Sequence, residues 1–215
     1  MTNHTRTRRL AIVSLLGGVA FVLMYISIPL PFLSPFAEFD LSAVPELIGG
    51  FSLGPSAAVQ IVVVKIALKL MFQGTESLLT GEVQNLILSL AFVLPAAFWY
   101  RRHRTRRGAV TGLVLGTVVN VVVSVFTNLY LILPAFIALY GMSWDSIVGM
   151  CSAMNPWITS IPTMVVFSVL PFNLLARCVN ASLTLLVYKK ISVPLKKILN
   201  ESECVRSNRH ELQCE

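Results

Sequence analysis

The sequence contains long stretches without a charged side chain, and four of them restrict the possible fold more than any other feature. These stretches run from Leu10 to Ala37, from Val83 to Tyr100, from Gly108 to Trp144 and from Ser146 to Ala176. A membrane-spanning helix needs roughly 20 predominantly apolar residues. Only 13% of the 215 residues are charged, whereas a soluble chain carries about 25%. We therefore predict an all-α integral membrane protein.

The basic residues that give the chain its net charge of +7 are gathered in clusters next to the ends of apolar stretches. The three clusters are Arg6, Arg8 and Arg9; Arg101, Arg102, Arg104, Arg106 and Arg107; and Lys189, Lys190, Lys196 and Lys197. Cytoplasmic loops of membrane proteins carry such an excess, and anionic lipid attracts it. We expect all three clusters on the cytoplasmic side, with membrane lipid rather than nucleic acid as their partner.

The pattern of apolar stretches and prolines predicts a six-helix bundle with both termini cytoplasmic. Residues 1–9 form a basic cytoplasmic segment, residues 10–190 a single six-helix transmembrane domain, and residues 191–215 a polar cytoplasmic tail. The expected helices are 10–28, 43–53, 56–72, 82–100, 109–130 with a continuation through 133–136, and 170–188. The second helix is too short to span the membrane alone.

Two segments between the predicted helices differ from the spanning helices in their pattern. Residues 29–40 contain three prolines, which forbid a continuing helix, and their apolar side chains favour a loop that folds over the bundle. Residues 143–169 are apolar enough for a further helix or a re-entrant segment. An extra crossing would place the C-terminal lysines outside, so an external interfacial segment is favoured.

Arg177 and Asn173 are the most informative polar residues, because a cation inside a membrane helix costs at least about 2.5 kcal/mol and faces a cavity or a partner. They are four residues apart and share one helix face. If the helix begins at Leu170, Arg177 lies roughly 10 Å deep, at a depth that matches Asn128 near the outer end of its helix. The other polar residues in apolar helices are Lys65, Lys69, Asn85, Asn120 and Asn180. Each asparagine either contacts a ligand or joins two helices by a hydrogen bond, and Lys69 either contacts a ligand or extends to the interface.

The sequence offers little for catalysis. Gly50-Phe51-Ser52-Leu53-Gly54 fits the pattern of a serine nucleophile, but all three histidines lie in basic cytoplasmic segments, so a tight turn explains it better. Neither the ATP-binding motif nor a zinc-hydrolase motif is present. We expect the acidic residues to lie outside or at helix ends, with Glu46 the deepest, which leaves no carboxylate for ion coupling. Transport by this chain would then need a separate energising partner.

Several strings, in order along the chain, resemble the riboflavin-specific S component of energy-coupling factor (ECF) vitamin transporters. They are Glu38-Phe39-Asp40-Leu41-Ser42-Ala43-Val44-Pro45, Gly54-Pro55 with Lys65 eleven residues on, Gln73-Gly74, Gly81-Glu82-Val83-Gln84-Asn85, Asn128-Leu129-Tyr130-Leu131-Ile132-Leu133-Pro134-Ala135-Phe136 and Leu170-Pro171-Phe172-Asn173.

The resemblance implies a six-helix subunit in the cytoplasmic membrane of a prokaryote. Such a subunit binds riboflavin, and also flavin mononucleotide, from outside. It docks on a membrane T subunit driven by two cytoplasmic ATPases. Riboflavin is then the transported substrate, with no cofactor and no metal. The ligand-binding residues implied by the matching strings, together with the cation of the last helix, are Asn128, Tyr130, Asn173, Arg177, Asp40, Asn85 and Lys65.

Within this resemblance, the two amides Asn128 and Asn173 look like the groups that hold the polar edge of the isoalloxazine ring, and residues 29–40 look like a lid. The family pattern has a lysine three residues after the asparagine that matches Asn173, where this chain has Ala176 followed by Arg177. Because offsets of three and four share a helix face, Arg177 is positioned to replace that lysine with different reach and hydrogen bonding.

The first helix carries a small-x-x-x-small spacing, Ser14 and Gly18, that lets helix backbones approach closely. The resemblance implies that the T subunit docks there, whereas the same spacing would also suit packing inside the bundle. Three other functions remain open: an S component for another vitamin, an intramembrane hydrolase using Ser52, and a scaffold without a ligand.

Overall fold

The computed structural model describes residues 3–29, 38–74, 79–141, 143–153 and 155–188. The elements are α1 (Asn3–Tyr25), β1 (Ile28–Pro29), β2 (Glu38–Phe39), α2 (Ala43–Leu53), α3 (Pro55–Phe72), α4 (Thr80–Arg102), α5 (Arg106–Thr127), η1 (Asn128–Ile132), α6 (Leu133–Tyr140), α7 (Trp144–Ser152), α8 (Ile161–Met164) and η2 (Val165–Val169). Helix continues from η2 to Tyr188, so Ile161–Tyr188 forms one long helix, the last helix. The predicted C-terminal tail lies outside the described residues.

Five helices of the described chain are long and apolar enough to cross a membrane, and α2 is a shorter apolar helix of 11 residues. The two strands are only two residues each and pair antiparallel, Ile28 opposite Phe39. The prediction of an all-α multi-pass membrane bundle is therefore confirmed.

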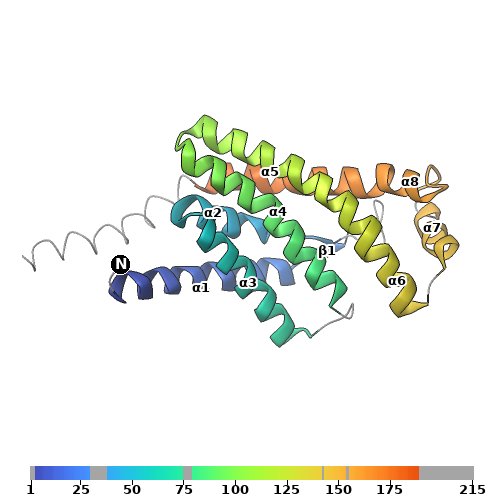
Figure 1. Ribbon diagram of the computed structural model, residues 1–215, viewed down its shortest axis with the longest axis horizontal. Coiled ribbons are helices and arrows are strands. Elements are labelled where there is room, and N and C mark those ends of the chain that lie inside the picture. The colour runs from blue at the N-terminus through green and yellow to red at the C-terminus, as the bar shows by residue number, and fades with distance from the viewer. Residues whose placement is uncertain (1–2, 30–37, 75–78, 142, 154, 189–215) are drawn as a thin grey trace, which may run out of the picture.

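The helices run back and forth along the long axis of the molecule (Figure 1). At one end, Arg9 of α1 lies beside the α2–α3 turn and the residues after Tyr100, and the Tyr100 hydroxyl lies 2.8 Å from that of Tyr188. The end of α6, together with α7 and α8, lies at the other end (Figure 1). The N-terminal arginines and the arginines of the α4–α5 turn thus share one end of the bundle.

Helix boundaries differ from the prediction at both ends of the chain. α1 begins at Asn3 rather than Leu10, because arginine is a good helix former and Arg9 is held by the α3 residue Ser56, to whose Oγ its Nη2 donates at 2.7 Å. The last helix begins at Ile161, nine residues before the predicted start. Most of the segment 143–169 is thus helical, as α7 and the first turns of the last helix.

The start of the last helix was predicted wrongly because of Pro171. Proline suits the first turn of a helix, but Pro171 lies in the helix interior. Proline lacks an N–H and its ring clashes with the carbonyl four residues back. Two of the interior prolines are preceded by a wider π-helical turn: η1 ends two residues before Pro134, and η2 ends two residues before Pro171. Pro95, inside α4, has no such turn before it. The π turns let both helices continue through a proline.

Small residues bring α4 and α5 into close contact. A Cβ on Gly112 would lie 2.9 Å from the carbonyl oxygen of Ala96, and a Cβ on Gly116 would collide with the carbonyl oxygen of Phe92. The largest hydrophobic cluster surrounds this contact and includes Leu47, Phe92, Val93 and Leu113. Backbone contact between α4 and α5 therefore sets how closely the centre of the bundle packs.

We predict that Gly116→Ala destabilises the bundle by about 1–3 kcal/mol, because the added methyl group must push two backbones apart. The measurement is thermal unfolding of the purified protein in detergent. Gly149→Ala is the matched control, since a Cβ there meets nothing within 4 Å. Equal unfolding midpoints for both variants would contradict the close contact.

Candidate ligand-binding site

Lys65 lies at the centre of a buried polar network that joins α2, α3 and α4. Its side chain is fully buried, and its Nζ lies 2.5 Å from Oε1 of Glu46, which is also fully buried. The same Nζ donates to Ser42 Oγ at 3.2 Å, Asn85 Oδ1 at 3.0 Å and Ser89 Oγ at 3.0 Å. Since an ammonium has three protons, these groups use its full donor capacity.

This network corrects one expectation from the sequence. Glu46 lies in the first turn of α2, near a helix end as predicted, but its side chain is fully buried inside the bundle, where Lys65 of α3 offsets its charge. A buried ion pair is retained only where hydrogen bonds satisfy the remaining atoms. The hydroxyl and amide partners of Lys65 fulfil that requirement on its side, whereas Oε2 of Glu46 has no hydrogen-bond partner among the described residues.

A second set of contacts joins the last helix to the segment before α2. Nδ2 of Asn180 donates to the carbonyl oxygen of Asp40 at 3.1 Å, across 140 positions of sequence. Oδ1 of Asp40 accepts hydrogen bonds from the Ser42 backbone N–H and hydroxyl. Because Ser42 also contacts Lys65, polar contacts run without a break from the last helix to α4.

Arg177 points from the last helix toward α4 and α5. Its Nε donates to Oδ1 of the fully buried Asn120 at 3.1 Å, and its Cζ lies 5.2 Å from the centre of the Phe92 ring. Nδ2 of Asn120 in turn donates to the Leu88 carbonyl oxygen at 2.7 Å. Phe92 and Asn120 thus hold the guanidinium by a cation–π contact and a hydrogen bond.

We call the connected and neighbouring polar groups the polar layer: Asp40, Ser42, Glu46, Lys65, Asn85, Ser89, Asn120, Arg177 and Asn180. Four of the predicted ligand-binding residues, Asp40, Lys65, Asn85 and Arg177, belong to it. The structure therefore brings together polar residues that are up to 140 positions apart in the sequence.

The two predicted amides, Asn128 and Asn173, are placed at the π turns. Nδ2 of Asn128, the first residue of η1, donates to the Ser124 carbonyl oxygen at 2.8 Å. Nδ2 of Asn173 donates at 2.9 Å to the carbonyl oxygen of Val169, the last residue of η2. Each amide thus keeps its oxygen and one N–H for another partner. Single π turns occur frequently at functional sites.

The predicted depths change with the helix boundaries. Arg177 lies sixteen residues after Ile161, roughly 24 Å along the helix, so it is near the middle of the span rather than close to its start. Asn128 lies well inside the continuous helix Arg106–Leu139 rather than near its outer end. Tyr130 is 72% exposed and stacks on Phe126 at 6.3 Å, so its ring points away from the polar layer.

Some residues of the polar layer were missed as candidate site residues. Asn120 and Asn180 stood out in the sequence as polar residues in apolar helices, but their partners, Arg177 and Asp40, come from distant segments. The roles of Ser42 and Ser89 had no signal, because serine is common in membrane helices. The two π turns each precede a Leu-Pro pair inside an apolar stretch, but this pattern did not identify them, because Leu94-Pro95 lies in regular helix.

The small residues of α1 divide between two faces. Gly17 faces inward, where a Cβ would lie 2.6 Å from Cγ1 of Val64 on α3. Ser14 and Gly18 face outward, and a Cβ on Gly18 would meet nothing within 4 Å. They line an apolar hollow of about 440 Å³ with Leu15, Val19, Val22 and Leu23. The close packing inside the bundle thus uses Gly17 rather than the Ser14–Gly18 pair.

Ser52 of the Gly-x-Ser-x-Gly string has no base beside it. Its Oγ is buried without a hydrogen-bond partner among the described residues, in a hollow lined by arginines. The only histidine described with a ring contact, His103, stacks on Trp99 with ring centres 5.1 Å apart.

Comparison with known proteins gives a consistent picture. A family model described as "ECF transporter, substrate-specific component" matches residues 8–188. The protein named riboflavin transporter RibU of Staphylococcus aureus (strain TCH60) is 31% identical over 196 residues, 91% of this chain and 96% of the relative. Riboflavin transporter FmnP of Bacillus subtilis (strain 168) is 30% identical over 189 residues, 86% of this chain and 93% of the relative.

One solved structure has the same fold over nearly its whole length. It is described as "Structure and mechanism of the S component of a bacterial ECF transporter" and aligns with a TM-score of 0.70 and 29% identity. The alignment covers 89% of this chain and 99% of that chain.

The network around Lys65 generates a stability prediction. Lys65→Met leaves Glu46 buried without its partner and should cost about 3–5 kcal/mol, whereas Lys65→Met combined with Glu46→Leu should recover much of that loss. Unfolding of the single and double variants measures both effects. The control is Lys69→Met, because Lys69 is 22% exposed and lies 3.4 Å from Glu82. A loss at Lys69 as large as at Lys65 would contradict the central role of the buried pair.

Proposed function

The chain belongs to the ECF transporter family of substrate-specific components, and on that premise we propose that it captures riboflavin for import. Both named relatives are riboflavin transporters and match over more than 90% of their own length. As a transporter subunit of this family, the protein is not an enzyme. The observation that carries the proposal is the polar layer inside an apolar bundle, with the cation Arg177 hydrogen-bonded to the amide of Asn120.

The proposed contacts follow from the hydrogen-bonding groups of the flavin ring. Its uracil-like edge alternates carbonyl oxygens and an N–H, which an amide side chain complements with its own donor and acceptor. Asn128 and Asn173 are proposed to bind that edge. Arg177 is proposed to donate to a carbonyl through its terminal nitrogens, which have no hydrogen bond to any described residue.

The other candidate residues take supporting roles in this proposal. Lys65 and Asn85 hold α2, α3 and α4 in register through the buried network, and Asp40 ties the segment before α2 to the last helix. The exposed Tyr130 is left out of the contact set. Two hollows of the described chain, on α1 and at the α2–α3 turn, lie away from these residues.

Orientation and partners follow from charge and from the surface of α1. The arginine-rich end of the bundle is proposed to face the cytoplasm, with both termini there, in the cytoplasmic membrane of a prokaryote. The sequence carries no ATP-binding motif, so a T subunit and two ATPases are proposed to supply the energy. We propose that the T subunit packs on the hollow beside Ser14 and Gly18, which the bundle leaves open.

The proposed ligand predicts a visible property. Protein purified in detergent from riboflavin-replete cells should be yellow, with quenched flavin fluorescence. Asn173→Ala should weaken riboflavin binding by about 1–3 kcal/mol, since it leaves a buried polar group of the ligand unpaired. Titration calorimetry measures the change, and Gln60→Ala on the exposed face of α3 is the control. If the protein is colourless, does not bind added flavin and binds another vitamin, that vitamin replaces riboflavin as the proposed substrate.

The proposed docking surface predicts a separation of binding from transport. Gly18→Leu fills the hollow on α1 without touching the bundle, so riboflavin binding by the isolated chain should stay within about twofold while uptake by cells falls at least tenfold. Gly149→Leu is the matched control, because that helical glycine also has open space around its Cβ. Unchanged uptake with Gly18→Leu would exclude this face as the docking surface.

A further inference from the structure

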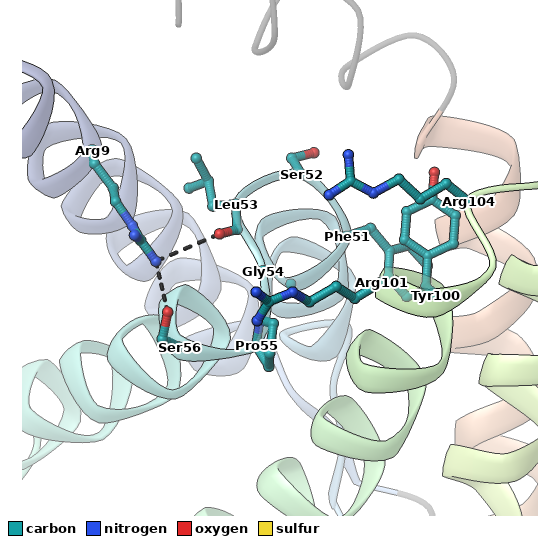
Figure 2. A pocket seen from close by; sticks show the side chains of 11 residues that line it. Arg9, Phe51, Ser52, Leu53, Gly54, Pro55, Ser56, Tyr100, Arg101 and Arg104 are labelled. Carbon is teal, nitrogen blue, oxygen red and sulfur yellow. Dashed lines mark hydrogen bonds between the residues drawn. The ribbon is translucent and has the colours of Figure 1, made fainter. Parts of the chain in front are cut away.

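A hollow lined by three arginines lies where α2 turns into α3. Its volume is about 270 Å³, and its cationic residues are Arg9 from α1 with Arg101 and Arg104 from the end of α4 and the turn after it. Figure 2 shows the side chains of Arg101 and Arg104 extending toward the turn from one side and that of Arg9 from the other. The remaining residues that line it are Gly50, Phe51, Ser52, Leu53, Gly54, Pro55, Ser56 and Tyr100.

The positive charge of this hollow is not neutralised by the described part of the chain. No acidic residue is among those that line it. Arg101 and Arg104 are exposed and form no ion pair with a described residue. Three guanidinium groups that converge without a counter-charge repel one another, so the arrangement favours an anion between them.

Two buried polar atoms of the hollow also lack partners. Nε of Arg9 and Oγ of Ser52 are both buried without a hydrogen bond to any described residue. Buried polar groups in folded proteins are almost always hydrogen-bonded, so each such atom calls for an explanation. A donor N–H and a hydroxyl beside a cationic hollow suit an oxyanion that accepts hydrogen bonds.

The local backbone has opposing effects. The N-terminus of the 18-residue helix α3 favours an anion, whereas the last carbonyls of α2 favour a cation. Arg9 already places a cation next to the last carbonyls of α2, since its Nη2 lies 3.5 Å from the Leu53 carbonyl oxygen. The same Nη2 lies 2.7 Å from Ser56 Oγ. The side chains of Arg101 and Arg104 therefore remain as the groups free to bind an anion.

We propose that this hollow binds a phosphate group, and that an anionic membrane lipid supplies it. Guanidinium groups match phosphate oxygens with paired hydrogen bonds. The hollow lies at the end of the spanning helices α1, α3 and α4, where lipid headgroups meet the protein. Basic pockets between helix ends are known to bind the headgroups of anionic lipids. The inference does not depend on the identity of the transported substrate.

The test measures lipid binding to the full-length protein in neutral detergent by native mass spectrometry. The probes are phosphatidylglycerol, diacylglycerol, which lacks the phosphate, and inorganic phosphate. The variant Arg101→Gln with Arg104→Gln removes two charges from the hollow. Arg106→Gln with Arg107→Gln is the matched control, since it removes two exposed charges from the nearby start of α5, outside the hollow.

We expect one tightly bound phosphatidylglycerol, with binding about tenfold weaker in the Arg101/Arg104 variant and changed less than about threefold in the control. Diacylglycerol should not bind. If millimolar inorganic phosphate displaces phosphatidylglycerol from the protein, the hollow is a phosphate site, but its ligand is a soluble anion rather than a lipid.

Two results would overturn the proposal. Equal weakening by both pairs of substitutions would mean that only the general surface charge attracts lipid. The second result combines two observations: the unaltered protein binds neither lipid nor phosphate, and the Arg101/Arg104 variant no longer assembles with partner subunits. The hollow would then be a binding site for an acidic protein partner. Unfolding midpoints of both variants, measured in parallel, show that a lost signal does not come from misfolding.

Discussion

The buried pair of Lys65 and Glu46 is the interaction on which the rest of this structure depends. Each charge alone would be costly inside an apolar bundle, and together they are stable there only because hydroxyl and amide groups surround the ammonium. The pair fixes the short helix α2 against α3 and α4. Ser42 extends the network to Asp40, and Asp40 extends it to the last helix. The segment before α2 and the last helix, which carries Arg177, are thus connected to one centre.

The π turns give two helices a second role. Regular helices with an interior proline would kink or lose hydrogen bonds, whereas a wider turn before Pro134 and Pro171 absorbs the missing donor. The asparagines at these turns each bond one local carbonyl and retain hydrogen-bonding capacity. The same local irregularity therefore preserves the span and supplies polar groups within it, as a binding subunit of the membrane requires.

Three features lie in different parts of the bundle: its interior, one outer face and one end. The polar layer lies inside, the open face of α1 exposes the small residues Ser14 and Gly18, and the arginine-lined hollow lies where the helices end. Gly17 shows why the α1 faces differ: its backbone touches Val64, whereas the space above Gly18 is open. Each surface can therefore be altered without disturbing the others.

The sequence alone determined the membrane bundle, the family and most of the polar candidates, because uncharged stretches and isolated polar residues such as Asn173 and Arg177 are visible without coordinates. It predicted the bounds of α2 correctly, since Gly54-Pro55 ends that helix unambiguously. It placed the start of the last helix wrongly, because an interior proline and an N-terminal proline look alike in one dimension. Only the tertiary structure decided that Glu46 pairs with Lys65, that Asn120 holds Arg177 and that Tyr130 faces outward. Those outcomes depend on which faces of distant helices meet, and on the electrostatic cost of a charge that meets no partner.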